Sequence, residues 1–357
     1  MSSVVISGDT SGAVTISAPA VAGTTTLTLP ATSGTILQSG TTVTEAQGGT
    51  GTSTGYYGFK NRIINGAMVI DQRNAGAVTT PTNTVYTLDR WRSLLTQASK
   101  YTVQQNAGAV TPPAGFRSYL GITSSASAYS VISTDYFVQQ QFIEGYNFAD
   151  FAFGTASAST ITISFWVRSS LTGTFGGSVF NNDGSRCYAF TYTISVANTW
   201  EYKTVTIAGD TTGTWNTTSS TGLAINFGLG VGSSNSISAG AWSGTFGYSA
   251  TGATSVVGTA NATFYVTGVQ LEKGSTATSF DYRPYGTELA LCQRYYEQAN
   301  MAVYSTVTRN MYSFHLPKRA NPTVTLTTGT IVNSYEDFAS YSNGADAATT
   351  MKITAEL

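Results

Sequence analysis

The sequence has little charge and no long hydrophobic run. Only 10% of its 357 residues are charged, against roughly 25% in ordinary globular proteins, and the formal net charge is −1. It therefore lacks the basic surface that phosphate backbones or anionic lipids attract. No apolar run approaches the roughly 20 residues that cross a bilayer, and the first residues have neither the basic start nor the apolar core of a signal peptide. We expect no nucleic-acid partner and no membrane insertion.

Cysteine and histidine are equally scarce. Cys187 and Cys292 are too few for a disulfide framework, which is consistent with synthesis in a reducing compartment. Each is interpreted as a small packed side chain. His315 is the only histidine, so a metal cluster built from histidines is excluded.

No catalytic group stands out, and we predict that the protein is not an enzyme. A glycosidase needs two carboxylates that flank the scissile bond. Pairs of acidic residues that are close in the sequence, such as Glu144 and Asp150, occur by chance in a chain with 18 acidic residues. Ser313 and His315 alternate along a predicted strand, without the strained turn that exposes a nucleophile.

Aromatic, β-branched and glycine residues are plentiful, and they predict strands. Residues 4–37 contain three short candidates, Val4 to Ile6, Ala13 to Ile16 and Thr25 to Leu29, separated by turn residues. Strands this short cannot build a core by themselves. Copies of the chain could close each other's strand edges, so we expect this leader to dock on a partner or to wind with copies of itself.

Residues 60–285 predict an antiparallel sandwich or jelly roll. Ile161, Ile163, Phe165 and Val167 alternate with polar residues, and the turn at 182–184 joins two strands into a hairpin. In the opening stretch of this region, "KNRIINGAMVIDQRNAG" (60–76), we expect four apolar side chains to be buried and Asn65-Gly66 to form a turn. The four are Ile63, Ile64, Met68 and Ile70. Arg62, Asp71 and Arg73 are expected to pair with neighbouring chains or to hydrogen-bond backbone.

One helix interrupts the strands. "YGTELALCQRYYEQAN" (285–300) offers Thr287 as N-cap and Glu288 in the first turn, with Leu289, Cys292 and Tyr296 at helical spacing. The strands that we predict after it make a small β unit, with residues 334–350 as a loop.

Seven phrases follow one another in order over residues 46–357. They are "AQGGTG" (46–51), "NRIINGAMVIDQR" (61–73), "YTLDRW" (86–91), "ISFWVRS" (163–169), "ANTWEYKTVTIAGDTTGTW" (197–215), "GVQLEKGSTATSFDYRPYGTELALCQRYYE" (268–297) and "LPKRANPTVT" (316–325). Together they resemble tail-fibre and tail-tip proteins of bacteriophages and prophages. The resemblance implies a homotrimeric virion fibre that is made in the cytoplasm of a bacterial host. Its implied partners are itself, other tail or capsid proteins, and a host surface polysaccharide or lipopolysaccharide.

The predicted fold class is therefore mainly β, in four parts. Residues 1–45 form a short-stranded attachment or fibre segment, and 46–59 a Gly/Thr-rich linker. Residues 60–285 form a jelly roll that the resemblance likens to a carbohydrate-binding module. Residues 286–357 form the helix with a small C-terminal β domain, which the resemblance places at or near the distal end.

The candidate ligand contacts are aromatic and polar, because a sugar ring offers an apolar face and a rim of hydroxyls. Trp215 and Trp242 lie in Gly/Ser/Thr-rich loops, and Trp166 and Arg168 lie on the polar face of the 161–169 strand. For each tryptophan the alternative is a packing role, and for the strand pair it is contact with a neighbouring subunit.

A second candidate surface is cationic. Lys318, Arg319 and Asn321 stand between two prolines and would suit an acidic glycan, or would be an ordinary solvated turn. Glu272 is a candidate ligand for a structural calcium ion, because the resemblance implies an acid in the last strand of such jelly rolls. No other metal or cofactor is expected.

Four functions are compatible with these features. The leading hypothesis is a fibre that attaches to the virion by its N-terminus and recognises a host surface glycan. The alternatives are a structural capsid or tail decoration or adaptor fibre without a receptor site, a polysaccharide depolymerase, and a cellular carbohydrate-binding or adhesin module.

Overall fold

A computed structural model describes residues 3–7, 11–17, 59–303, 310–342 and 347–357. They belong to two units, 1–55 and 56–357. In the first unit, β1 (Ser3–Ser7) pairs antiparallel with β2 (Ala13–Ser17), which confirms two of the three strands predicted in the leader. The predicted strand from Thr25 to Leu29 and all but the last residue of the 46–59 linker lie outside the described residues.

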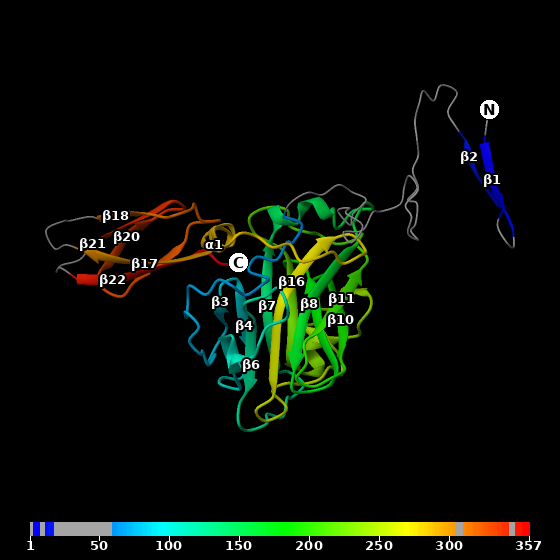
Figure 1. The fold of residues 1–357 in the computed structure, drawn as a ribbon. Coiled ribbons are helices and arrows are strands. Elements are labelled where there is room, and N and C mark those ends of the chain that lie inside the picture. Colours follow the sequence, from blue (N-terminus) through cyan, green and yellow to red (C-terminus); the bar gives the residue numbers. More distant parts are fainter. Residues whose placement is uncertain (1–2, 8–10, 18–58, 304–309, 343–346) are drawn as a thin grey trace. The chain divides into compact units, whose positions relative to one another are not determined.

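The second unit is built on a sandwich of two antiparallel sheets, as the alternating pattern predicted (Figure 1). One sheet has seven strands in the order β14-β10-β9-β12-β7-β4-β3, and the other has five in the order β11-β8-β16-β6-β5. The seven are β3 (Val85–Leu88), β4 (Trp91–Leu95), β7 (Tyr136–Glu144), β9 (Gly173–Phe180), β10 (Cys187–Ile194), β12 (Thr221–Val231) and β14 (Trp242–Ser243). The five are β5 (Tyr101–Gln105), β6 (Leu120–Ser124), β8 (Ile161–Ser169), β11 (Glu201–Ile207) and β16 (Thr263–Lys273).

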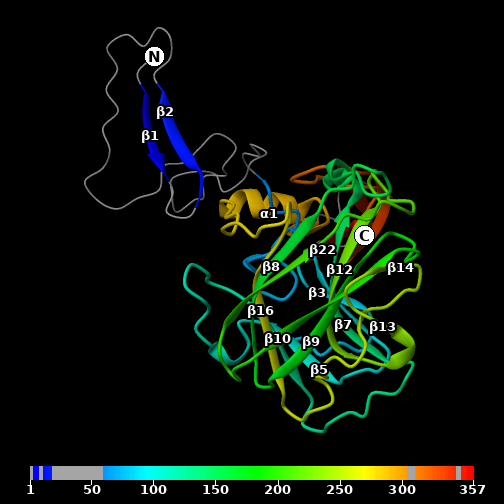
Figure 2. The same cartoon turned by 90° about the vertical axis from the view of Figure 1, so that its right-hand side faces the viewer.

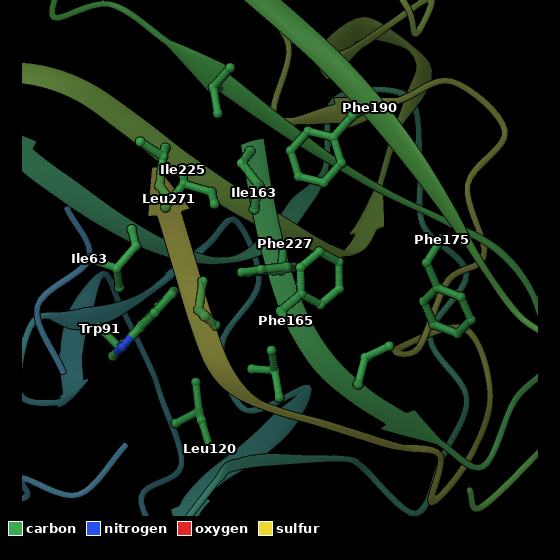
Figure 3. Packing of buried hydrophobic residues seen from close by; sticks show 14 of the residues in the cluster. Ile63, Trp91, Leu120, Ile163, Phe165, Phe175, Phe190, Ile225, Phe227 and Leu271 are labelled. Carbon is green, nitrogen blue, oxygen red and sulfur yellow. The ribbon is translucent and has the colours of Figure 1, made fainter. Parts of the chain in front are cut away.

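The core lies between the two sheets. Because successive side chains of a strand point to opposite faces, Ile163 and Phe165 of β8 face inward and meet Ile225 and Phe227 of β12 in one buried cluster (Figure 3). Phe165 and Phe227 stand edge to face, with ring centroids 5.0 Å apart. Each fully buried side chain of this size stabilises the fold by roughly 1.5–3 kcal/mol.

A segment after β12 folds back over the outer face of the seven-stranded sheet. Within it β13 (Ser236–Ile237) pairs parallel with β15 (Ser249–Ala250), and β14 pairs with β10 at the edge of the sheet (Figure 2). The close approach depends on glycine: a Cβ added to Gly176 or Gly228 would lie 2.4 Å or 2.7 Å from Ser249 Oγ. Four short 3-10 turns complete this part, at Ala107–Ala109, Gly145–Asn147, Ala149–Phe151 and Ser233–Asn235.

The stretch 60–76 joins the sandwich to the C-terminal part. Ile63 and Met68 enter the sandwich core, whereas Ile64 and Ile70 pack against Cys292 and Tyr295, so the burial predicted for all four is confirmed. Asn65 takes a left-handed conformation with φ 57°, as the predicted turn requires.

The charged residues of this stretch pair within the chain. Arg62 Nη2 lies 2.9 Å from Asp150 Oδ2, and Arg73 Nη2 lies 2.7 Å from Glu356 Oε1. Asp71 accepts from the backbone N–H groups of Asn74 and Gly76. Of the two expectations for Asp71, hydrogen bonding to backbone is the one that this structure shows. Arg62 and Arg73 each pair with a carboxylate of the same chain.

In the C-terminal part, the described residues 285–303, 310–342 and 347–357 form one helix and two three-stranded sheets, β17-β22-β19 and β18-β21-β20, around a small core of their own (Figure 1). The elements are α1 (Tyr285–Gln293), β17 (Tyr296–Val303), β18 (Asn310–Ser313), β19 (Thr323–Leu326), β20 (Thr330–Ser334), β21 (Phe338–Ser342) and β22 (Ala347–Thr354). The boundary predicted at residue 285 stays a prediction.

Two local expectations for this part are corrected. The helix begins one turn earlier than predicted, with Pro284 at the N-cap position in place of Thr287, and Tyr296 starts a strand instead of continuing the helix. The predicted loop 334–350 contains β21 and the start of β22, because Ala339 and Tyr341 of β21 are buried in the small core. No helix among the described residues is long and apolar enough to span a membrane.

Candidate functional site

The two loop tryptophans that the sequence singled out pack against the sandwich. Trp215 is 8% exposed, its ring stands edge-on to Phe153 and Trp242 with centroids 4.8 Å and 5.5 Å away, and its Nε1–H donates to Thr212 O at 3.1 Å. Trp242 is half-buried and donates to Ala208 O at 2.7 Å. A sugar platform needs a free ring face. The prediction that Trp215 contacts a ligand is therefore corrected, because its ring is enclosed by other aromatic rings.

Trp166 and Arg168 lie on the outer face of the five-stranded sheet. Trp166 packs beside Tyr202, which is 43% exposed, with ring centroids 5.4 Å apart. Arg168 Nε donates to Asn198 O at 2.9 Å, and the guanidinium lies 5.5 Å from the Tyr265 ring centroid. The pair is half-buried and faces away from the core, so both of its predicted roles stay predictions.

The cationic loop predicted near the tip is corrected. Lys318 Nζ donates to Glu297 Oε2 at 2.6 Å, and both side chains are 0% exposed. Arg319 donates to the carbonyl oxygens of Ala355 and Glu356 at 2.6 Å and 2.7 Å. A buried ammonium is costly unless it is paired, and Lys318 is paired with Glu297. Of the three residues only Asn321 is exposed.

Glu272 is buried and its carboxylate is occupied by protein donors. One oxygen accepts from Gln270 Nε2 at 2.8 Å and from the backbone N–H of Thr278 at 2.9 Å, and the other accepts from Thr278 Oγ1 at 2.6 Å. Within the described part of the chain no group of three or more His, Cys, Asp or Glu side chains could hold a metal ion. Calcium binding at Glu272 stays a prediction.

A cleft of about 460 Å³ opens on the outer face of the seven-stranded sheet. Arg92 and Gln140 line this cleft, and they begin a row of polar side chains that register brings side by side on four strands, from β4 through β7 and β12 to β9. Arg92 Nε donates to Gln140 Oε1 at 2.6 Å, Gln140 Nε2 donates to Asn226 Oδ1 at 2.8 Å, and Asn226 Nδ2 donates to Ser178 Oγ at 2.8 Å. Each amide orients the next, so the donor and acceptor directions along this row are fixed.

Aromatic rings form the walls of this cleft. Phe142 and Phe180 rise from the sheet, and Phe246 and Tyr248 come from the segment that folds back over it. The Phe246 ring stands edge-on to Phe180 and to Tyr248, with centroids 4.9 Å and 4.7 Å away. Three of these rings are only half-buried, so part of their surface is open to a ligand.

The hairpin turn between β9 and β10 borders the cleft with Asn182, Asp183 and Gly184. A side chain at Gly184 would not fit, because its Cβ would lie 2.8 Å from the Phe246 ring and the backbone there has φ +72°. Hydrogen bonds from Ser185 hold the pKa of the exposed Asp183 carboxyl below its ordinary value, so Asp183 is ionised at neutral pH. The turn thus offers amide and carboxylate groups at the rim.

The cleft combines what a carbohydrate site requires. Half-exposed rings can cover the apolar face of a sugar, and Arg92, Asn182 and Asp183 can hydrogen-bond its hydroxyls. Among the described residues that line the cleft, Asp183 is the one acidic side chain, whereas glycoside hydrolysis uses two.

Sequence reasoning did not find this cleft. The available signal was the run Gln139-Gln140-Gln141 in the middle of β7, since three amides in a row are unusual for a strand buried on both faces. Gln139 and Gln141 turn to the other side of β7, where they bond Ser93 and Ile64, and Gln140 faces the cleft.

Comparisons with known proteins found no matching protein family and no curated protein of similar sequence. Several solved structures are similar to this chain at low identity. A putative sugar binding protein from Bacteroides thetaiotaomicron is 13% identical, with a TM-score of 0.32 over 60% of this chain and 100% of that one. A family 11 carbohydrate-binding module of the cellulosomal cellulase Lic26A-Cel5E of Clostridium thermocellum is 12% identical, with a TM-score of 0.27 over 57% of this chain and 99% of that one.

A third similar structure is the enzymatically active domain of tailspike protein 4 of bacteriophage CBA120. It is 12% identical, with a TM-score of 0.34 over 60% of this chain. This chain spans 22% of the length of that protein.

Proposed function

We propose that this chain is a virion fibre component of a bacteriophage or prophage whose sandwich binds a host surface glycan in the cleft between Arg92 and Tyr248. The cleft carries the glycan part of the proposal, because Arg92 and Gln140 lie there between half-exposed aromatic walls and are held by a fixed row of hydrogen bonds. The fibre part is supported by the phrases over residues 46–357 that resemble tail-fibre and tail-tip proteins.

Binding would follow from the geometry of the cleft. Sugar rings would lie against Phe142, Phe246 and Tyr248, and their hydroxyls would exchange water for Arg92 and the rim of the hairpin turn. The aromatic contact area of one cleft is small, so a single site would bind weakly. A homotrimer, which is part of this proposal, would present three clefts together and could raise the overall avidity by roughly 10²- to 10⁴-fold.

The oligomeric state tests the fibre part. The full chain is expected to run as a trimer in size-exclusion chromatography with light scattering. A monomer at micromolar concentration would count against a fibre role.

The cleft is tested by removing its walls. Phe246→Ala and Tyr248→Ala are expected to weaken binding to a bacterial glycan array and to host cells by roughly 5- to 150-fold each, since stacking on an aromatic ring contributes on the order of 1–3 kcal/mol. The matched control is Tyr202→Ala, an exposed ring on the outer face of the other sheet. If Tyr202→Ala abolishes binding and the wall variants do not, the glycan site lies beside Trp166 instead.

The alternative functions are distinguished with the wild-type protein in the same binding assays and in a hydrolysis assay. A wild-type chain that binds neither cells nor any glycan on the array would favour a structural decoration or adaptor fibre. Release of reducing ends from host polysaccharide would show a depolymerase.

A further inference from the structure

Arg92 carries a charge that the protein itself does not neutralise. Its guanidinium lies 4.2 Å from the Phe142 ring centroid, and its Nε–H donates to the neutral oxygen of Gln140 at 2.6 Å. Among the described residues it forms no ion pair, although six other arginines do. A cation that lines a ligand-sized cleft without a carboxylate partner is unusual, because a charge taken out of water is normally paired.

The nearby carboxylates are engaged elsewhere. Glu356 is shared by Arg73 and Arg90. Leu357 also lines the cleft, and its oxygen accepts from Tyr86 Oη at 3.0 Å. Asp183, the other charged side chain in the lining, is exposed at the turn, bonds Ser185, and makes no ion pair with Arg92. Tyr86 and Tyr248 also face Arg92 and are neutral at physiological pH.

The orientation of the Arg92 guanidinium is fixed in a way that suits binding of a planar anion. The stack on Phe142 and the bond to Gln140 fix the plane of the fork, so the two terminal nitrogens lose little freedom when a ligand binds. Burial lowers the pKa of Arg92, which shows that the charge is partly desolvated. A ligand that supplies a negative oxygen pair would offset this desolvation, and a neutral sugar would not.

We infer that the cleft selects an anionic glycan, in which an oxyanion of one sugar residue takes both terminal nitrogens of Arg92 while the ring packs on the aromatic walls. This inference rests on the proposed glycan-binding function. The shared chemistry is an oxyanion with two oxygens at the spacing of the guanidinium fork, which is met by the carboxylate of a uronic acid and by a sugar phosphate. Sugars of either kind are compatible with the geometry, and the experiment separates them.

The experiment uses the full chain on an array that holds uronic-acid polysaccharides, their carboxyl-reduced counterparts, phosphate-bearing polysaccharides and neutral polysaccharides. The variants are Arg92→Gln and Arg92→Lys, with Arg117→Gln as matched control, because Arg117 is an exposed arginine beside the other sheet. Thermal unfolding of each variant establishes that it is folded. Titrations are repeated at high salt.

We expect acidic polysaccharides to bind and their carboxyl-reduced or dephosphorylated counterparts to bind weakly. Arg92→Gln should weaken binding to the acidic glycans roughly 10- to 100-fold, as loss of a charged hydrogen-bonding partner does. Arg92→Lys keeps the charge without the fork and should fall between the wild type and Arg92→Gln. Arg117→Gln should bind like the wild type, and the uronate and phosphate arms show which oxyanion is taken.

Two other outcomes have distinct meanings. If neutral and acidic glycans bind equally well, and Arg92→Gln and the wall variants weaken both, the anionic preference is overturned and the glycan site remains. If the wild type binds no glycan, or the wall variants bind as well as the wild type, the cleft is not the site and both proposals fail.

Discussion

Glu297 offers a sharp test of how the C-terminal sheets are held together. Its carboxylate is 0% exposed and accepts hydrogen bonds from Lys318 Nζ at 2.6 Å, Tyr312 Oη at 2.8 Å and the backbone N–H of His315 at 3.2 Å. Glu297→Gln removes the negative charge and leaves the Lys318 ammonium, which is also 0% exposed, beside a neutral amide. Breaking a buried pair from one side typically costs about 3–5 kcal/mol.

Hydrogen exchange measures this cost locally, which matters because a chain with several folded parts has no single unfolding free energy. Peptides from β17 and β22 should exchange roughly 10²- to 10⁴-fold faster in Glu297→Gln, whereas peptides from β7 and β12 should not change. Glu336→Gln, at an exposed carboxylate of the same part of the chain, is the matched control. Less than a tenfold change in β22 would refute the reasoning.

Two further measurements sharpen the test. Adding Lys318→Met to Glu297→Gln removes both charges and should recover most of the lost protection. Burial alone would raise the pKa of Glu297, but hydrogen bonds from Lys318, His315 and Tyr312 outweigh it, so the pKa lies below the ordinary 4.5. A depressed folded pKa gives stability above the unfolded pKa that is lost as pH falls through the folded value. Protection of β22 should therefore decline below about pH 4.5 in the wild type and less in the variant.

Three other predictions concern residues away from the cleft. Glu356→Gln, which leaves the buried Arg90 without its carboxylate, should cost about 3–5 kcal/mol and lower the main calorimetric transition by several degrees. Trp215→Ala should cost about 3–5 kcal/mol by creating a cavity, and a cost below 1 kcal/mol would restore Trp215 as an exposed contact. Burial raises the pKa of Asp89 to about 6 from 3.8, so its stabilising contribution is present below pH 3.8 and is lost as pH rises through 6. Urea unfolding between pH 4 and 7 should show this loss in the wild type but not in Asp89→Asn.

Local patterns in the sequence determined most of the strands. The alternation from Ile161 to Val167 identified both β8 and its inward face, because successive side chains of a strand point to opposite sides whatever the rest of the chain does. The hairpin turn at 182–184 and the burial of Ile63 and Met68 follow from residue type in the same way. These features depend on a few neighbouring residues, so the sequence alone predicts them.

The candidate site is a product of the tertiary structure. Arg92, Gln140 and Asn226 lie on strands far apart in the sequence, and only the order of strands in the sheet makes them neighbours. The same non-local packing encloses Trp215 and pairs Lys318 with Glu297. Both residues were candidate ligand contacts in the sequence, and both are buried in the structure. Periodicity in the sequence identifies the two faces of a strand. Which segment covers each face depends on long-range contacts, and these contacts leave the cleft beside Arg92 open.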